Sequence, residues 1–337
     1  MTQGILLVGG MGTRLLPLTQ SVPKPMLPVA GLPVTEHQLM AAKTAGITSI
    51  VLAASYLSDV FIPYFGDGSK WGIDLKYAVE EEPLGTGGAI RNASRLLNED
   101  EPIAIFNGDV LSSHNLAAQI EQHLARDADV TLHLTRVSDA RPYGCVPVDV
   151  NGRVEAFLEK MEKPLTDTVN AGCYIFHPRT LREIPENEVV SVERATFPQL
   201  VAAGRRVFGF IDNSYWLDIG TPGTLLQGSI DLVQGNAQAP ALDRLQIDRH
   251  QGRYVAMPGS RIASSSQITG GCAIGRDVEV AEDTKLNASI ISDGAVVLSG
   301  ASLNRCFVSV DAIVPTGSNF SDSYIDKEGG VTLIAGK

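Results

Sequence analysis

The chain has 337 residues and a formal net charge of −11, from 38 acidic and 27 basic side chains. Its hydrophobic fraction of 44% excludes a disordered chain, and its length fits one large domain plus a smaller one. The sequence has no long Lys/Arg run for a nucleic-acid duplex and no apolar run near the length of a membrane span. We therefore expect a soluble, cytoplasmic protein that binds neither nucleic acid nor membrane.

The four cysteines carry no recognisable metal or redox motif. Cys145, Cys173, Cys272 and Cys306 form no Cys-x-x-Cys pair, and no nearby histidine completes a zinc-ligand spacing. We expect reduced thiols, as is usual inside a cell. The sequence also implies no Ser/His/Asp or Cys/His nucleophile.

The first two thirds of the chain alternate between short apolar runs and amphipathic stretches. The amphipathic stretches 36–45 and 116–126 predict helices, and Gly46 stops the first of them. The apolar runs are bounded by turn residues, as buried strands are. The expected strands are Ile5–Val8, Ile50–Ala54, Leu75–Val79, Ile103–Phe106, Val130–Leu134 and Ala171–Phe176. Alternation of this kind predicts an α/β fold whose mostly parallel sheet is covered by helices on both faces.

The pattern changes after residue 235. Apolar residues then step by six, and one step per turn is shortened to five, so that similar triplets recur every 17 residues. This period predicts a triangular parallel β-helix with one inward aliphatic residue on each face of each coil. The inward series is Ile262, Ile268, Ile274, Val280, Leu286, Ile291, Val297, Leu303, Val308, Val314, Phe320 and Ile325. We expect a catalytic domain over 1–235, a polar linker over 236–254 and a left-handed β-helix domain of hexapeptide-type repeats over 255–337.

A glycine-rich turn follows the first expected strand directly, in the segment LVGGMGTRL (7–15). Backbone N–H groups in such a turn can bind an anion. The segment lacks the Gly-Lys-Ser/Thr ending of a Walker loop, and Leu15 replaces the third glycine of a dinucleotide fingerprint. Lys24 follows between two prolines, which limit the freedom of its backbone. Arg14 and Lys24 would bring two positive charges to one polyphosphate.

The motif Gly9-Gly10-x-Gly12-Thr13-Arg14-Leu15, followed by Pro23-Lys24-Pro25, resembles the signature of the sugar-phosphate nucleotidyltransferases, also called nucleotide-sugar pyrophosphorylases. The resemblance extends over nearly the whole chain, including the β-helix, and is strongest to the mannose-1-phosphate guanylyltransferase branch. It implies a Rossmann-like mixed sheet flanked by helices. It also implies a Mg²⁺-dependent transfer from GTP to mannose 1-phosphate, giving GDP-mannose and pyrophosphate.

Two aspartates match the metal-binding aspartates of that family, and the first of them follows an expected strand. Asp109 ends the segment Asn107-Gly108-Asp109, and Asp218 lies in the segment 216–222. Each alone would read as a turn or helix-cap residue. Together they suit Mg²⁺, whose coordination shell would be completed by phosphate oxygens and water. The attacking sugar phosphate is already ionised, so the direct in-line attack on the α-phosphorus needs no general base. The resemblance makes Arg14, Lys24 and Asp109 the catalytic residues.

Three glutamates in a row, at 80–82, follow the expected strand Leu75–Val79. They would ordinarily form a solvated acidic turn. One carboxylate can, however, accept both adjacent donors of guanine, and a pyrimidine would oppose it with acceptors. Glu80 is the expected base reader, with Glu82 as the alternative. Gly85–Gly88 would let the backbone approach the base or ribose. The expected nucleotide contacts are Leu7, Gly9, Gly10, Gly12, Thr13, Arg14, Lys24, Glu80, Pro83, Gly85 and Thr86.

The segment Phe157-Leu158-Glu159-Lys160 resembles the family's sugar-phosphate segment, in which the glutamate binds sugar hydroxyls and the lysine binds the phosphate. This chain departs from the pattern because the proline follows Lys163 instead, after a second Glu-Lys pair. We choose Glu159 and Lys160, whose preceding residues match. The expected sugar-phosphate contacts are Gly108, Gly144, Glu159, Lys160 and Asn170.

Other functions remain open at this stage. A glucose-1-phosphate thymidylyl- or uridylyltransferase would share the fold, and so would a catalytically silent regulatory subunit. An acyltransferase would need a histidine base in the β-helix, where the sequence has none after His250. The β-helix is therefore expected to serve in assembly, and the partners are a nucleoside triphosphate, a sugar 1-phosphate and further copies in a homo-oligomer.

Overall fold

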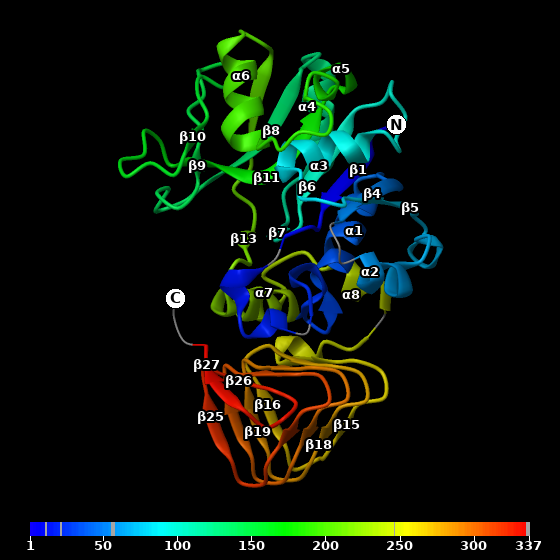
Figure 1. Cartoon of the computed structure of the whole chain (residues 1–337). Coiled ribbons are helices and arrows are strands. Elements are labelled where there is room, and N and C mark those ends of the chain that lie inside the picture. The colour runs from blue at the N-terminus through cyan, green and yellow to red at the C-terminus, as the bar shows by residue number, and fades with distance from the viewer. Residues whose placement is uncertain (11, 21, 55–57, 246, 335–337) are drawn as a thin grey trace. The chain divides into compact units, whose positions relative to one another are not determined.

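A computed structural model describes residues 1–337 apart from 11, 21, 55–57, 246 and 335–337. The chain divides into two compact units (Figure 1). Unit 1 contains Met1–Gly10 and Ala42–Trp216, and unit 2 contains Met11–Ala41 and Leu217–Lys337. The division differs from the expected domain boundaries because the N-terminal segment 11–41 belongs with the C-terminal part of the chain. The expected boundaries at 235 and 254 stay a prediction.

Unit 1 is built on one nine-stranded sheet. Its main path runs β10-β9-β11-β6-β1-β4-β5, and β8 and β12 extend it beside β11. The strands are β1 (Gln3–Leu7), β4 (Ser49–Ala54), β5 (Asp74–Val79), β6 (Ile103–Asn107), β8 (Val130–Arg136), β9 (Gly144–Cys145), β10 (Leu158–Glu159), β11 (Thr168–Phe176) and β12 (Val207–Ile211). All six strands expected from the sequence are present. The sheet is mixed because β11 runs antiparallel to β6 and β8.

Helices pack on this sheet where amphipathic stretches predict them. Helix α3 packs on β1 and β4, and α4 packs on β8, β11 and β12. The two predicted helices appear as α1 (Val34–Thr44) and α4 (Leu116–Ala125). The others are α2 (Ser58–Phe65), α3 (Gly85–Ser94), α5 (Pro178–Leu181), α6 (Phe197–Ala202) and the π-helix η5 (Val192–Thr196). Aliphatic residues of the central strands and the rings of Tyr174, Phe176 and Phe197 form the core.

Unit 2 combines the N-terminal segment with helix α7 (Pro222–Gln234), helix α8 (Pro240–Leu245) and the β-helix. Short 3-10 helices cover 13–15, 18–20 and 24–26, and a small hairpin joins β2 (Pro28–Val29) to β3 (Leu32–Pro33). The hydroxyl of Ser229 on α7 accepts a hydrogen bond from the Ala30 N–H. The expected linker segment 236–254 contains α8, whose Ala241 and Leu242 are buried.

The β-helix has three parallel sheets, and Figure 1 shows its coils stacked from yellow to red. Strands pair with a spacing of 18 residues in the first coil and 17 afterwards, as Tyr254 with Cys272 and Ala273 with Ile290 show. The three columns are β14, β17, β20, β23, β26 and β27; then β15, β18, β21 and β24; then β16, β19, β22 and β25. The strand bounds are 254–256, 261–262, 267–269, 272–274, 279–280, 285–287, 290–291, 296–297, 302–304, 307–308, 313–314, 319–321, 323–325 and 331–333. The last strand, β27 (Val331–Leu333), is antiparallel to its neighbour.

The inward aliphatic series is confirmed, because ten of its twelve members are buried in one cluster and Ile262 and Phe320 pack against it. A second buried column lies at the five-residue step. There Ser289 N–H donates to the Cys272 sulfur, and Cys306 N–H donates to the Ser289 hydroxyl. All four cysteines are buried free thiols. Among the described residues, no helix has the length and apolar character needed to cross a membrane.

Candidate active site

The carboxyl ends of parallel strands β1, β4, β5 and β6 meet at one edge of the unit 1 sheet. Leu7, at the end of β1, accepts a hydrogen bond from the Gly108 N–H at 3.0 Å. Glu80 follows β5, and its N–H donates to the Ala54 carbonyl at the end of β4. Open α/β sheets bind ligands at this edge. The structure thus brings the expected residues Leu7, Glu80 and Gly108 to one edge.

Gly108 is required by packing at this edge. A Cβ on Gly108 would lie 2.1 Å from the Leu7 carbonyl oxygen, far inside van der Waals contact. Any side chain would therefore separate the turn that carries Asp109 from strand β1. Gly10 differs, since a Cβ there would meet no atom of the described residues within 4 Å. Open space at Gly10 is consistent with a surface turn.

Glu80 stands apart from the two glutamates that follow it. Glu80 is half-buried, whereas Glu81 and Glu82 are exposed. One Glu80 oxygen accepts a hydrogen bond from the Leu84 N–H at 3.2 Å. The other oxygen is buried and has no partner among the described residues. Burial raises the pKa of the Glu80 carboxyl, against the opposing effect of the Leu84 N–H.

The glycines at 85–88 pack against the segment Glu188–Val190. A Cβ on Gly85 would lie 2.6 Å from the Val190 carbonyl oxygen, and one on Gly88 would lie 2.6 Å from the Glu188 carbonyl oxygen. The Gly87 N–H donates to the Val190 carbonyl, and the Val190 N–H donates to the Leu84 carbonyl. Close backbone packing within unit 1 therefore accounts for these glycines, and the expected approach of this backbone to a base or ribose stays a prediction.

Glu193 is a residue that sequence reasoning missed. It lies in the π-helix η5, a rare element that often marks functional sites. Its carboxylate accepts hydrogen bonds from the hydroxyls of Thr86 at 2.8 Å and Ser191 at 3.0 Å. The Thr86 hydroxyl also accepts from the Val192 N–H. The expected nucleotide residue Thr86 is thus held by a segment more than a hundred residues away in the chain.

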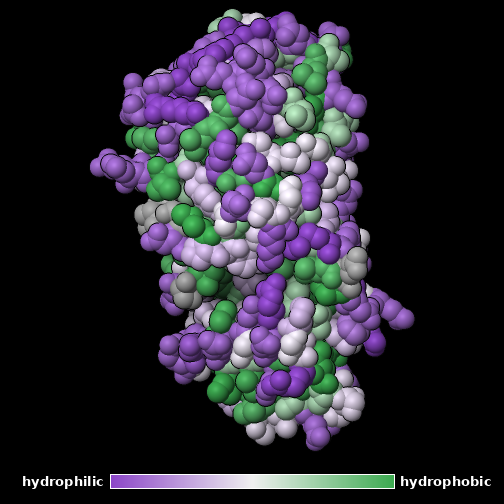
Figure 2. Space-filling view, turned by 90° about the vertical axis from the view of Figure 1, so that its right-hand side faces the viewer, coloured by the Kyte–Doolittle hydropathy of each residue, from purple (hydrophilic) through white to green (hydrophobic). Residues whose placement is uncertain are grey.

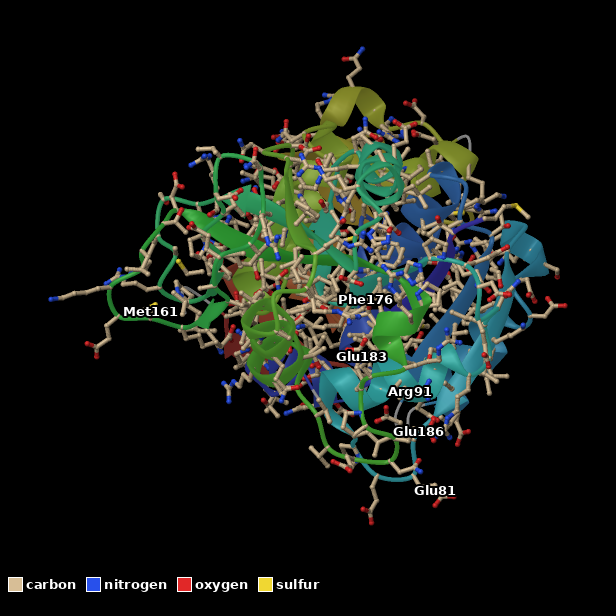
Figure 3. The ribbon with its side chains drawn as sticks, turned by 90° about the horizontal axis from the view of Figure 1, so that it is seen from above. Glu81, Arg91, Met161, Phe176, Glu183 and Glu186 are labelled. Atoms are coloured by element: carbon tan, nitrogen blue, oxygen red, sulfur yellow. The ribbon has the colours of Figure 1, made fainter. Side chains whose placement is uncertain are left out.

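The expected sugar residues Gly144 and Glu159 are paired across strands β9 and β10. A Cβ on Gly144 would lie 2.9 Å from a Glu159 carboxylate oxygen, so glycine leaves room for that side chain. The pKa of the Glu159 carboxyl is raised, and burial is the largest cause. The charge of Lys160 lowers this pKa, and the charge of Glu193 raises it. The Lys160 ammonium lies 4.0 Å from the Glu159 carboxylate and is exposed. Lys163 is also exposed, on the loop that Met161 begins at the left edge of Figure 3.

Tyr174 links Asn170 to the strand end that carries Asp109. The Tyr174 hydroxyl accepts hydrogen bonds from the amide of Asn170 at 2.9 Å and from that of Asn107 at 3.3 Å. Pairing of β11 with β8 shifts register between Asn170 and Tyr174, and Gly172 lies in this bulge at φ +78°. Bulges of this kind re-aim side chains beside functional sites. Sequence reasoning selected Asn170 but missed Tyr174, because an aromatic strand residue reads as core.

Five candidate residues lie in unit 2, namely Gly12, Thr13, Arg14, Lys24 and Asp218, whereas Gly9 and Pro83 belong to unit 1. Gly12 has φ +63°, and a Cβ there would lie 2.9 Å from the Lys24 Cβ. Lys24 is buried at 8% exposure, and Thr13 and Arg14 are exposed. A Cβ on Gly220 would lie 2.9 Å from an Asp218 carboxylate oxygen and 3.1 Å from an Arg14 guanidinium nitrogen. Within unit 2, Arg14 and Asp218 therefore border the same glycine.

The acidic donors suit a hard cation better than a transition metal. The described residues contain no group of three or more His, Cys, Asp or Glu side chains that could hold a metal ion. Mg²⁺ commonly takes only one or two carboxylates and completes its shell with water and phosphate oxygens. The carboxylate oxygens of Asp109 in unit 1 and of Asp218 in unit 2 are ligands of the kind that Mg²⁺ takes.

A glycine turn and carboxylates at the ends of parallel strands, joined in one chain to a β-helix, define a nucleotide-handling α/β protein. The chain belongs to the nucleotidyl transferase family, whose model matches residues 3–235. It is a sugar-phosphate nucleotidyltransferase by its similarity to curated relatives, and enzymes of this family generally use a divalent metal.

Two curated relatives extend over most of the chain. A mannose-1-phosphate guanylyltransferase of Mycobacterium tuberculosis is 46% identical over 302 residues, covering 89% of this chain and 82% of the relative. A probable mannose-1-phosphate guanylyltransferase 2 of rice, Oryza sativa subsp. japonica, is 32% identical over 96% of this chain and 85% of its own length. Both alignments extend beyond the region that the family model matches.

Solved structures agree on the fold. HddC from Yersinia pseudotuberculosis complexed with GMP-PN is 29% identical with a TM-score of 0.59, covering 68% of this chain and 98% of that one. A putative glucose-1-phosphate thymidylyltransferase from Bacillus anthracis has a TM-score of 0.62 at 21% identity, over 68% of this chain and 94% of that one. The second likeness supports the fold alone.

Proposed function

We propose that the chain transfers a guanylyl group from GTP to mannose 1-phosphate, yielding GDP-mannose and pyrophosphate for nucleotide-sugar biosynthesis. The names of the two curated relatives support this choice of substrates. The structural observation that supports guanine as the base is the environment of the Glu80 carboxylate. One of its oxygens is bound by the Leu84 N–H, and the other is buried without a partner in the described structure.

Guanine offers an imino N–H and an amino group side by side, and a carboxylate accepts from both. Uracil and thymine would set carbonyl oxygens against Glu80 and leave its buried charge unsatisfied. The base preference therefore follows from what Glu80 can accept. Exposed Glu82 lacks the burial that makes such a mismatch costly.

The phosphates would be bound by the glycine turn and by Lys24 and Arg14. Backbone N–H groups after β1 suit an anion, and the two cations offset charge as pyrophosphate leaves. Asp109 and Asp218 would supply carboxylates to Mg²⁺, which would reduce the repulsion between two anionic substrates when bound. Neither proton abstraction nor a covalent enzyme intermediate is needed, since the sugar phosphate attacks the α-phosphorus directly.

Sugar recognition is assigned to Glu159 and Asn170. Glu159 faces Gly144 across a strand pair, and Asn170 is fixed by the Tyr174 hydroxyl. A carboxylate and an amide together accept and donate, as recognition of sugar hydroxyls requires. We assign the sugar phosphate to Lys160, which lies beside Glu159.

The first experiment measures pyrophosphate release over a matrix of nucleoside triphosphates and sugar 1-phosphates, with Mg²⁺ or with EDTA. We expect turnover with GTP and mannose 1-phosphate, abolished by EDTA. Turnover with UTP or dTTP and glucose 1-phosphate would replace the proposal with the thymidylyl- or uridylyltransferase alternative. Silence with every pair would favour a regulatory subunit.

The second experiment tests base reading by exchanging one carboxylate for an amide. Glu80→Gln should lower kcat/KM for GTP by about 10- to 100-fold, because hydrogen bonds to a charged acceptor are lost. The kcat/KM for UTP should not fall. Glu82→Gln is the matched control and should leave both values unchanged. Equal losses for all nucleotides in Glu80→Gln would remove Glu80 from base reading.

We also propose a homo-oligomer. The β-helix exposes Val310, Ile313, Val331 and Leu333. Figure 2, which labels none of these residues, shows further apolar groups on the lower part of the face it displays. Exposed apolar side chains at the end of a β-helix suit contact with a second subunit. Light scattering of the full chain would test this, and a monomer at every concentration would exclude it.

A further inference from the structure

Two histidines are stacked on each other, and one of them, His114, follows Asp109 by five residues in the sequence. The rings of His114 and His133 are 3.9 Å apart at their centroids and inclined by 15°. His114 follows strand β7 (Val110–Ser112), and His133 lies buried in strand β8. We call the set Ser112, His114, Gln119, His133 and Asp212 the histidine clasp.

Hydrogen bonds fix the protonation of His114. The amide nitrogen of Gln119 donates to the carbonyls of Thr131 at 3.2 Å and Cys173 at 3.4 Å, so the amide oxygen faces His114 Nε2 at 3.0 Å. His114 Nε2 must then carry the proton, and Nδ1 accepts from the Ser112 hydroxyl at 2.9 Å. Every polar atom of the neutral ring is used. The ring therefore holds the end of β7 against helix α4.

The clasp also holds a second segment, residues 212–215. His133 Nε2 lies 3.4 Å from the Asp212 carbonyl oxygen. The Asp212 carboxylate accepts from the N–H groups of Asn115 at 2.9 Å and Ser214 at 2.8 Å. The Ser113 N–H donates to the Tyr215 carbonyl at 2.8 Å. Backbone on both sides of His114 is thus bound to the segment that leads to Asp218.

We propose that His114 is a positioning residue, which fixes the turn carrying Asp109 by binding the chain after it to helix α4 and stacking on His133. Asp109 itself begins the short connection from β6 to the clasp, five residues before His114 in the sequence. The proposal rests on the catalytic role proposed for Asp109. A displacement of about 1 Å in a reacting site can cost about a hundredfold in rate.

Burial keeps the clasp neutral. Burial, aided by the neighbouring His114, lowers the pKa of His133 to about 3. Burial also lowers the pKa of His114, against the hydrogen bond with Gln119 and the charge of Asp212. Hydrogen bonds from Asn115 and Ser214 outweigh burial at Asp212 and lower its pKa. Two stacked neutral rings beside one carboxylate avoid the repulsion that two imidazolium ions would suffer.

The test compares His114→Ala with the matched control His123→Ala. His123 is also buried between α4 and β8, where its Nδ1 lies 3.0 Å from the Thr131 hydroxyl, but no hydrogen bond joins it to residues 109–115 or 212–215 in the described structure. Hydrogen exchange is measured on the metal-free, nucleotide-free full chain. His114→Ala should speed exchange of the Ser113 and Asn115 amides about tenfold or more, and His123→Ala should leave both unchanged.

Steady-state kinetics then connects the clasp to Asp109. His114→Ala should lower kcat by about tenfold or more and raise the half-saturating Mg²⁺ concentration, with KM for GTP within about twofold. His114→Gln, whose amide can again donate to Gln119, should recover most of kcat, and it also serves if the alanine variant fails to fold.

The proposal is overturned if the two alanine variants lower the melting temperature alike while His114→Ala leaves the exchange of the two amides and kcat unchanged. That result would give His114 the same purely structural role as His123. Failure of the catalytic role proposed for Asp109 would instead appear as full activity of an Asp109→Asn variant. In that case the exchange result would still report on the clasp alone.

Discussion

The β-helix of unit 2 and the sheet edge of unit 1 encode their structures differently. In the β-helix, the place of a residue in the 17-residue period decides whether its side chain is buried. One buried column therefore contains Ile274, Ile291, Val308 and Ile325. At the sheet edge, three consecutive glutamates differ, because Glu80 is half-buried and the next two are exposed. A repeat averages local signals over several coils, whereas a site depends on single contacts.

Two glycines of the chain also show that the role of a residue can depend on a single contact. Gly108 is needed because one carbonyl, that of Leu7, occupies the space a side chain would fill, and Gly10 has open space around it. The two residues look alike in the sequence, as glycines after strands. Their different roles arise from neighbours that the sequence does not identify.

The largest expected effect is on activity, and it tests whether the chemistry belongs to the sheet edge. Asp109→Asn should lower kcat by about a hundredfold or more, because a carboxylate proposed to hold Mg²⁺ is lost. Asp283→Asn, the same exchange in the β-helix, should leave kcat unchanged. An equal fall in pyrophosphate release in both variants would show that catalysis does not belong to the sheet edge alone.

The next effect is on stability at the sheet edge. Gly108→Ala should lower the free energy of unfolding by about 3 kcal/mol, because the new Cβ overlaps the Leu7 carbonyl oxygen. Gly10→Ala should change it by less than about 0.5 kcal/mol. Denaturant titration of both variants measures the difference. Similar values would show that packing at 108 is not tighter than at 10.

The β-helix offers a matched isoleucine pair. Ile291→Ala should cost about 2–5 kcal/mol, because Ile291 is 1% exposed inside the coil stack. At protein concentrations low enough to keep the chain monomeric, Ile313→Ala should cost less than about 0.5 kcal/mol, since Ile313 is 55% exposed in the single chain. Thermal and denaturant unfolding of the full chain provide the values. A large cost at Ile313 would instead indicate that this face is covered in an oligomer.

Per pH unit, the smallest effect is the pH dependence of stability, which should arise from histidines of the sheet unit. Burial lowers the pKa of His133 to about 3 and that of His123 to about 4. Unfolded histidine titrates near 6.5, so between that pH and the folded pKa the unfolded state binds more protons. The free energy of unfolding should therefore fall as pH drops below about 6.5, by at most about 1.4 kcal/mol per pH unit for each histidine.

His133→Gln removes one of these titrating groups and should flatten the slope between pH 6 and about 4. Residues 254–337 contain no histidine, so the coils contribute nothing from this residue type. Urea titrations at several pH values measure the slope for both proteins. An unchanged slope would mean that His133 is protonated in the folded protein.

Features that depend on residues near one another in the sequence could be predicted, whereas features that depend on distant segments could not. The six strands, the helices near 36–45 and 116–126 and the inward β-helix series were predictable, because hydrophobic periodicity is a local property. Antiparallel β11 was not predictable, since strand direction within a sheet depends on connections between distant segments. The family motif identified Glu80 and Asn170 as candidates but gave no account of the contacts that position them.

The sequence by itself determined the order of α/β elements, the β-helix with its 17-residue period and the identity of the family. Only the tertiary structure decided that Tyr174 joins Asn107 to Asn170, that Glu193 binds Thr86 and that His114 stacks on His133. The physical reason is range. Burial of a repeating aliphatic face is specified by neighbours a few residues away. A single hydrogen bond between side chains as far apart as Thr86 and Glu193 exists only once the strands and helices that carry them are packed.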